Sequence, residues 1–166
     1  MVAMSARPGP ILRSVLRAPR ALDRWRLGWL LGHRFLLLEH VGRSTGSRYQ
    51  TVLEVIAYDR STGQAIVMSG WGKASDWYRN VEVAGHAKVT LGRKTIMARA
   101  RVLEDNEAAS VLADYERRNR WIRPVVRRVL SQLAGLRYDG TDDSRLVLVH
   151  QLPIVKFTPA ISTDDP

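Results

Sequence analysis

The chain has 166 residues, with 22 arginines, only 4 lysines and 16 acidic residues, which gives a formal net charge of +10 at pH 7. This length fits one domain, and an apolar content of 45% supports a packed core, which excludes a chain disordered throughout. The lack of cysteine excludes disulfides, thiolate metal sites and a cysteine nucleophile. The positive charge favours an anionic partner: nucleic acid, acidic lipid, or a phosphorylated or carboxylated small molecule.

The amino-terminal segment, residues 1–34, is predicted to form two short basic helices. It has seven arginines and one acidic residue, Asp23, and it lacks the apolar core of a secretory signal. No apolar run in the sequence approaches the ~20 residues of a membrane span, so a cytoplasmic location is expected. Two interpretations stay open. The helices attach the protein peripherally to the anionic inner face of the membrane, or they cover one end of the core.

The next part of the chain, up to residue 103, has the patterns of antiparallel strands. An apolar run over 35–40 and a β-branched run over 51–59 flank a six-residue basic loop, which predicts a hairpin. Further strands are expected at 64–69, 87–91 and 95–103. In the last of these, apolar side chains alternate with longer or charged ones, as in a half-buried strand.

Helices dominate the prediction for the remainder. Capping and acidic residues introduce a helix that ends near 115, and Pro124 suits the first turn of a helix that ends before Gly135. Final strands are expected at 145–150 and 154–158. The sequence therefore predicts an α+β fold, an antiparallel barrel with helices packed outside it. The predicted organisation is basic helices (1–34), a barrel domain that binds a cofactor (35–159) and a flexible tail (160–166).

The hairpin loop Gly42–Arg48 has the composition of an anion site. It contains two glycines, three hydroxyl side chains and the guanidinium groups of Arg43 and Arg48. Backbone N–H groups in such a turn form a concave anion site, and arginine binds phosphate or carboxylate through two hydrogen bonds. The spacing is not that of a Walker loop. A solvated hairpin loop remains the alternative.

A second segment, Ser69–Asn80, combines two glycines with three large aromatic side chains and two cations. Glycine lets a planar ring approach the backbone, and tryptophan and tyrosine provide stacking surface. The pattern indicates a site for a flat ligand. In the alternative interpretation, Trp77 and Tyr78 are core residues of a helix that begins at Ser75 or Asp76.

The remaining chemistry-bearing residues give weaker signals. The four histidines have no metal-ligand spacing, so no metal site is predicted, and no serine-hydrolase arrangement is found. The aromatic and basic segment Tyr115–Arg123 joins two predicted helices. It is interpreted either as a pocket wall or, preferably, as a solvated joint with Trp121 and Ile122 packed inward.

From about Arg34 to Leu103, and most of all in the two segments above, the sequence resembles the deazaflavin-dependent nitroreductase family of actinobacterial oxidoreductases. The resemblance implies a split β-barrel fold related to flavin-reductase-like proteins. It also implies reduced 8-hydroxy-5-deazaflavin (coenzyme F-420) as the cofactor, whose phosphate and oligoglutamate tail is strongly anionic.

Carried over by position, the resemblance implies three groups of cofactor-binding residues. The first group would hold the tail phosphate, the second would lie along the deazaflavin and the third would complete the motif: Arg43, Thr45, Gly46 and Ser47; Ser69, Gly70, Trp71, Gly72 and Lys73; Trp77, Tyr78 and Asn80. The family usually has an arginine where this chain has Tyr49, so either Arg48 replaces it or the tail is bound less tightly. The family's usual Asn-Pro is also absent, since residues 83–86 occupy its place.

The resemblance implies hydride transfer from the reduced cofactor to an electron-poor acceptor such as a quinone or nitroaromatic. The protein would position the ring and exclude water, without a dedicated base. Ser69 and Tyr115 are the candidate catalytic residues, Ser69 at the ring or acceptor and Tyr115 from the helical side. Alternatives are an FMN-dependent reductase of the same fold and a non-catalytic cofactor or lipid carrier. A nucleic-acid partner is disfavoured because no recognised motif is present, and a homodimer stays open.

Overall fold

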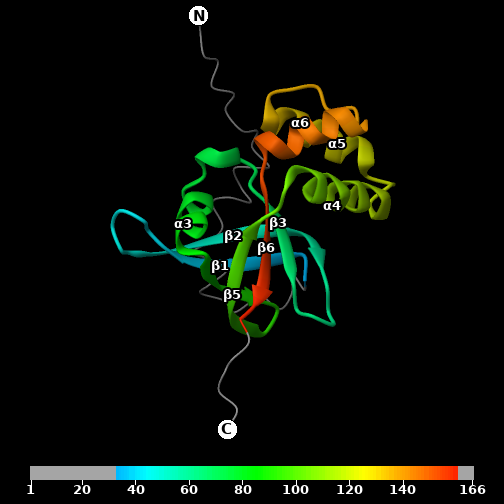
Figure 1. The fold of residues 1–166 in the computed structure, drawn as a ribbon. Coiled ribbons are helices and arrows are strands. Elements are labelled where there is room, and N and C mark those ends of the chain that lie inside the picture. Colours follow the sequence, from blue (N-terminus) through cyan, green and yellow to red (C-terminus); the bar gives the residue numbers. More distant parts are fainter. Residues whose placement is uncertain (1–32, 161–166) are drawn as a thin grey trace, which may run out of the picture.

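The structure is a computed structural model that describes residues 33–160. Six strands form a closed barrel in the order β1-β2-β3-β6-β5-β4, and every neighbouring pair is antiparallel (Figure 1). The strands are β1 (Phe35–Val41), β2 (Arg48–Tyr58), β3 (Ala65–Met68), β4 (His86–Leu91), β5 (Lys94–Val102) and β6 (Ile154–Pro159). The predicted basic helices fall in residues that lie outside the described range, apart from residues 33 and 34.

The barrel interior is filled by alternate residues of the strands. In β1, Leu36 and Leu38 are buried while their neighbours are half-buried, and in β5 Ala98 is buried between exposed Met97 and Arg99. Val67 and Phe157 complete this centre. Burial of each large apolar side chain contributes about 1.5 to 3 kcal/mol, so the inward-facing residues of the alternating strands stabilise the barrel.

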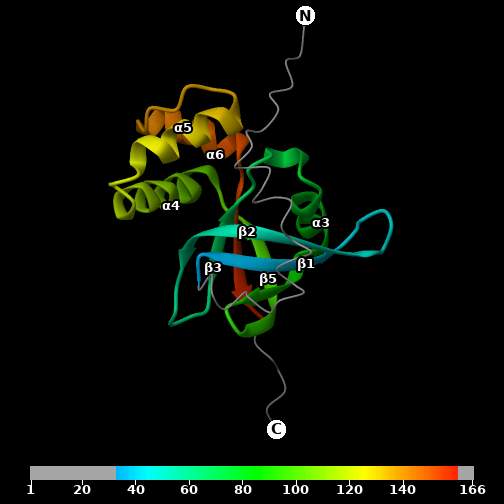
Figure 2. The same ribbon diagram turned by 180° about the vertical axis from the view of Figure 1, so that it is seen from behind.

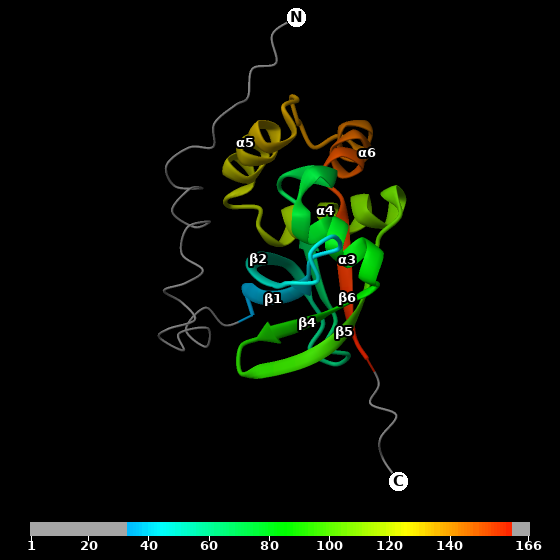
Figure 3. The ribbon, with the colours of Figure 1, turned by 90° about the vertical axis from the view of Figure 1, so that its left-hand side faces the viewer.

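In the described part of the chain, two groups of helices lie outside the barrel (Figures 1 and 2). The short helix η2 (Gly72–Ala74) and helix α3 (Asp76–Ala84) follow β3, and Figure 3 shows α3 beside the β1–β2 loop. The second group consists of α4 (Asp105–Arg118), α5 (Arg123–Ala134) and α6 (Asp142–Gln151). It packs on a second apolar cluster that includes Leu112, Leu148 and Ile154. The predicted α+β fold, an antiparallel barrel with flanking helices, is confirmed.

The predicted strand over residues 145–150 is wrong, because this segment belongs to α6. Thr141 caps the helix, since its hydroxyl accepts a hydrogen bond from the Ser144 N–H, and two aspartates lie in the first turn. Arg145, Leu148 and Val149 are buried, at a spacing that fits a helix. The short apolar run itself is compatible with either period, so the cap decides the element.

The predicted inward packing of the α4–α5 joint is also wrong. Trp121 is 84% exposed and Ile122 is 44% exposed. Helix α5 starts immediately afterwards and turns Leu130 toward the core, which places the apolar residues of its other side outward. Within residues 33–160, none of the helices has the length and apolar character needed to cross a membrane.

Candidate functional site

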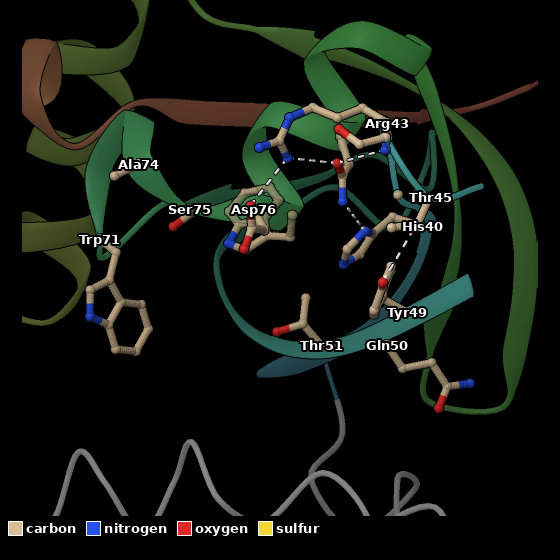
Figure 4. Close-up of a pocket in the computed structure, with 14 residues that line it drawn as sticks. His40, Arg43, Thr45, Tyr49, Gln50, Thr51, Trp71, Ala74, Ser75 and Asp76 are labelled. Carbon is tan, nitrogen blue, oxygen red and sulfur yellow. Dashed lines mark hydrogen bonds and ion pairs between the residues drawn. The ribbon is translucent and has the colours of Figure 1, made fainter. Parts of the chain in front are cut away.

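A cavity of about 730 Å³ lies between the β1–β2 hairpin and the η2–α3 segment (Figure 4). Its size is in the range of sites for small molecules and cofactors. The two segments singled out from the sequence are about 30 residues apart in the chain, and both contribute to its wall. The lining residues are His40, Gly42, Arg43, Ser44, Thr45, Tyr49, Gln50, Thr51, Trp71, Ala74, Ser75, Asp76, Trp77 and Asn80.

Arg43 connects the hairpin loop to α3. Its backbone N–H donates to Oδ1 of Asn80 at 3.0 Å, and its guanidinium Nη1 donates to the same oxygen at 2.9 Å. Nη1 also lies 3.2 Å from Oδ1 of Asp76, whose side chain is 81% exposed. A guanidinium carries five N–H donors, so Arg43 keeps donors for an anion in the cavity. The cavity therefore has a positioned cation at one end.

His40 lies in the same end of the cavity and is 6% exposed. Its Nδ1 is 3.0 Å from the amide nitrogen of Asn80, and its ring stacks on Tyr49 with centroids 5.9 Å apart. Burial lowers the pKa of His40, and the Asp76 carboxylate opposes this with a smaller upward effect. His40 is not among the site residues predicted from the sequence. Its signal was the strand alternation, because His40 follows Leu36 and Leu38 on the inward face.

The other end of the cavity is formed by the tryptophan segment. Trp71 is 50% exposed and lines the wall, so its ring is available for stacking. Gly72 has φ of +63°, and a Cβ at this position would lie 2.6 Å from the backbone oxygen of Gln151. Glycine is therefore required here for both conformation and space. The α6 end thus buttresses the loop that carries Trp71.

The structure brings five of the predicted cofactor-binding residues to the cavity wall: Arg43, Thr45, Trp71, Trp77 and Asn80. Trp77 and Tyr78 are also core residues at the start of α3, as the alternative interpretation expected. Tyr78 donates to Glu82, and burial together with this bond raises its pKa to about 12.

The other predicted residues are not among the lining residues. Ser69 is fully buried, donates to the Gly72 carbonyl at 2.8 Å and lies 2.9 Å from the Ser75 hydroxyl. The Arg48 side chain is 81% exposed and 4.0 Å from Glu39. The other predicted site residues outside the cavity lining are Gly46, Ser47, Gly70, Gly72, Lys73, Tyr78 and Tyr115.

Tyr115 lies on α4, and its hydroxyl donates to Glu54 at 3.4 Å. Burial is the largest influence on this phenol and raises its pKa. The second candidate catalytic residue is therefore bonded to a barrel strand, outside the cavity lining. The helical side of the cavity is instead represented by α3.

The site has donors for an anion at the Arg43 end and an exposed indole at the Trp71 end. A cofactor with a planar ring and an anionic tail fits this set of groups, because guanidinium and amide donors match phosphate oxygens. Fold and site together define a barrel protein built to hold such a cofactor.

The family model described as F420H(2)-dependent quinone reductase matches residues 12–127. The chain belongs to this family. It is a deazaflavin-dependent oxidoreductase, and its cofactor is reduced F420. The fold, enzyme class and cofactor implied by the sequence resemblance are confirmed.

One solved structure with a TM-score above 0.5 supports the fold. Atu2129 from Agrobacterium tumefaciens, a protein of unknown function, has a TM-score of 0.52 and 16% identity, and covers 86% of this chain. This chain spans 57% of the length of Atu2129. An F420-H2 dependent reductase, FDR-A, has a TM-score of 0.45 and 18% identity over 76% of this chain and 96% of its own. General Stress Protein 26 from Bacillus anthracis has a TM-score of 0.47 and 19% identity over 77% and 81%. No curated protein sequence matches the chain.

Proposed function

We propose that the cavity binds reduced F420 and that the protein reduces a quinone or a comparable electron-poor acceptor. One observation carries the proposal: residues of the loop Gly42–Arg48 and of the segment Ser69–Asn80, which were selected separately from the sequence, line the same cavity. The description of the matching family supports a quinone as the acceptor. The proposed class of electron-poor acceptors includes nitroaromatics as well as quinones.

In the proposed binding mode, the phosphate lies at the Arg43 and Thr45 end and the deazaflavin ring extends toward Trp71. Arg43 is suited to the phosphate because α3 holds its guanidinium from one side only. Trp71 is suited to the ring because half of its surface is open. Exposed Arg48 and Lys73 are available to the acidic tail outside the cavity, where their effect is screened by salt.

When bound, the reduced cofactor supplies a hydride, which together with one proton from water converts a quinone to a hydroquinone by a two-electron reduction. The chain's own residues bind and orient the reactants. Trp71 and Trp77 provide apolar wall that excludes water, and Arg43 neutralises cofactor charge. Ser69 contributes by holding the Gly72 turn, since its hydroxyl is bonded there.

Fluorescence titration of purified protein with F420, with FMN in parallel, tests the cofactor. We expect tighter binding of F420 and a clear loss of affinity at high salt, because the tail charges meet arginines at the surface. Equal or tighter FMN binding would support the FMN-dependent reductase of the same fold instead. Binding without turnover of any quinone or nitroaromatic would support the carrier alternative.

The catalytic candidates are separated by two matched variants. Tyr115→Phe removes one hydroxyl outside the cavity lining, and we expect kcat and the dissociation constant for F420 to stay within twofold of wild type. Ser69→Ala removes the bond to Gly72, so we expect weaker cofactor binding through a loosened loop. A tenfold fall in kcat at saturating F420 for Tyr115→Phe would restore a direct role for Tyr115.

Attachment to an anionic membrane and assembly into a homodimer remain predictions. The basic segment that motivates membrane attachment falls mainly in residues 1–32, which lie outside the described range. Sedimentation with anionic vesicles, before and after deletion of residues 1–20, tests the attachment. Unchanged vesicle binding after the deletion would contradict a role for this segment. Light scattering of the full chain tests the dimer.

A further inference from the structure

The hydrogen bonds around Asn80 determine which nitrogen of His40 carries its proton. Oδ1 of Asn80 accepts two hydrogen bonds from Arg43, one from the backbone N–H and one from the guanidinium. The NH₂ group of Asn80 therefore faces His40, at 3.0 Å from Nδ1. An amide NH₂ can only donate, so Nδ1 must be the acceptor. The neutral imidazole then carries its proton on Nε2.

Protonation of Nδ1 is opposed by the same network. A proton on Nδ1 would point at the Asn80 NH₂ group, and rotation of that amide would remove its oxygen from both Arg43 donors. The other groups around the ring are Tyr49, which stacks on it, and Asp76, the nearby carboxylate. The arrangement keeps His40 as a neutral donor through Nε2.

The Nε2–H group is accessible from the cavity. His40 lines the cavity. Figure 4 shows one nitrogen of its ring bonded to Asn80 and the other nitrogen at a different edge of the ring, away from that bond. Within residues 33–160, Nε of Arg145 is the only fully buried side-chain nitrogen or oxygen without a partner. Nε2 of His40 makes no hydrogen bond within residues 33–160, and it is not one of the fully buried atoms. A ligand in the cavity can therefore reach it.

We propose that His40 is a further binding residue of this cavity and that its Nε2–H donates a hydrogen bond to a phosphate oxygen of the cofactor. The inference rests on the proposed function. Phosphate is favoured over a ring carbonyl because His40 shares its end of the cavity with Arg43 and Thr45, whereas Trp71 lies at the other end (Figure 4). Arg43, Asn80 and His40 then form one hydrogen-bonded relay, in which no proton is transferred. It presents a charged donor, from Arg43, and a neutral donor, from His40, to the phosphate.

Three substitutions at His40 separate the donor from the shape of the ring. His40→Asn keeps an acceptor near the Nδ1 position, His40→Phe keeps the stacking on Tyr49, and both remove the Nε2–H donor. His40→Gln places an amide nitrogen close to Nε2. We expect the dissociation constant for F420 to rise about 10- to 100-fold in the first two variants, the usual effect of losing a hydrogen bond to a charged group. His40→Gln should recover most of the affinity.

A second ligand identifies the bonded atom. The deazaflavin chromophore with its ribityl chain but without phosphate or glutamates should bind the three variants and wild type equally well. An equal loss for this compound would overturn the phosphate contact in favour of a ring oxygen. Unchanged F420 affinity in folded His40→Asn and His40→Phe variants would overturn the role of His40 altogether.

Nitrogen NMR of the imidazole in the free protein tests the relay without any ligand. We expect the Nδ1 resonance of an unprotonated nitrogen and the Nε2 resonance of a protonated one, and a protonated Nδ1 would overturn the relay. If wild type binds neither ligand, the proposed function fails and the phosphate contact fails with it, while the NMR result still reports on the relay. Thermal unfolding of each variant checks that it is folded.

Discussion

Two polar clusters of this protein both contain arginine side chains but differ in what those arginines bond. At the cavity, Arg43, Asn80 and His40 form a chain of hydrogen bonds that ends in donors facing open space. In the helical group, the Glu116 carboxylate is 3% exposed and receives hydrogen bonds from three partners on other parts of the chain. The donors are Arg127 at 2.7 Å, Tyr138 at 2.8 Å and Arg145 at 3.2 Å.

The two clusters differ in whether their polar groups are already bonded within the protein. Glu116 joins α4 to α5 and α6, and its oxygens are occupied by protein donors, so the cluster has little capacity for a ligand. In the cavity cluster, the protein bonds the Arg43 side chain only from the α3 side, through Asn80 and Asp76. The open donors at the cavity wall are not fully buried, so they can bond to water or to a ligand, and this leaves the cavity cluster with the capacity to bind that the Glu116 carboxylate lacks.

The largest expected effect is the loss of the buried carboxylate. Glu116→Ala removes the carboxylate that Arg127, Tyr138 and Arg145 share, and of these Arg145 keeps bonds to Asp142 and the Gly140 carbonyl. We expect the free energy of unfolding to fall by about 3 to 5 kcal/mol. Urea denaturation measures this change. The control is Asp114→Ala on the same helix, which removes an exposed pair with Arg117 and should cost less than about 1 kcal/mol. Similar losses for the two variants would mean that Glu116 is not the organising group.

At the cavity, the expected effect falls on binding rather than folding. Arg43→Ala should weaken F420 binding by about 1.5 to 3 kcal/mol, because a charged hydrogen bond to phosphate is lost. Arg48→Ala is the matched control, since this arginine lies outside the cavity lining and is 81% exposed. Titration at low salt compares them. Equal losses would show that Arg48 replaces the family's displaced arginine.

Acid should reduce the stability that the Glu116 carboxylate provides, and the Glu116→Gln variant should not show this loss. Burial raises the pKa of Glu116, but the bonds from Arg127, Tyr138 and Arg145 lower it by more, so the net pKa lies below the ordinary value of 4.5. A depressed pKa gives stability that is present above pH 4.5 and is lost as the pH falls through the folded-state pKa. The stability difference between wild type and Glu116→Gln should therefore shrink below pH 4.5. A constant difference down to pH 2.5 would contradict this origin.

The smallest expected effect is at the exposed joint between α4 and α5. Trp121 is 84% exposed and its ring contacts the Arg120 guanidinium at 5.0 Å. We expect Trp121→Ser to change the free energy of unfolding by less than about 0.5 kcal/mol, as is usual for surface positions. Differential scanning calorimetry measures it, with Leu112→Ala in the same helical group as the buried comparison. A loss above 2 kcal/mol would show that the joint packs inward in solution.

Local pattern was sufficient where one period or one cap dominated. The alternation around Ala98 and the glycine-rich loop after Val41 predicted the strands and the hairpin correctly, because a strand's two faces differ in burial. Pro124 and Gly135 likewise marked both ends of α5. The run 145–150 was assigned wrongly, because six residues fit both periods and the capping role of Thr141 was not recognised.

The sequence by itself determined the antiparallel barrel, singled out the two segments that line the cavity and, through its motif, indicated the family and cofactor. Only the tertiary structure decided how these segments meet. It joined Arg43 to Asn80 across 37 residues, placed His40 in the same network and turned Arg48 and Trp121 outward. The physical reason is that hydrogen-bond partners and burial between distant segments depend on how the closed barrel positions α3 and the hairpin, which no local periodicity records.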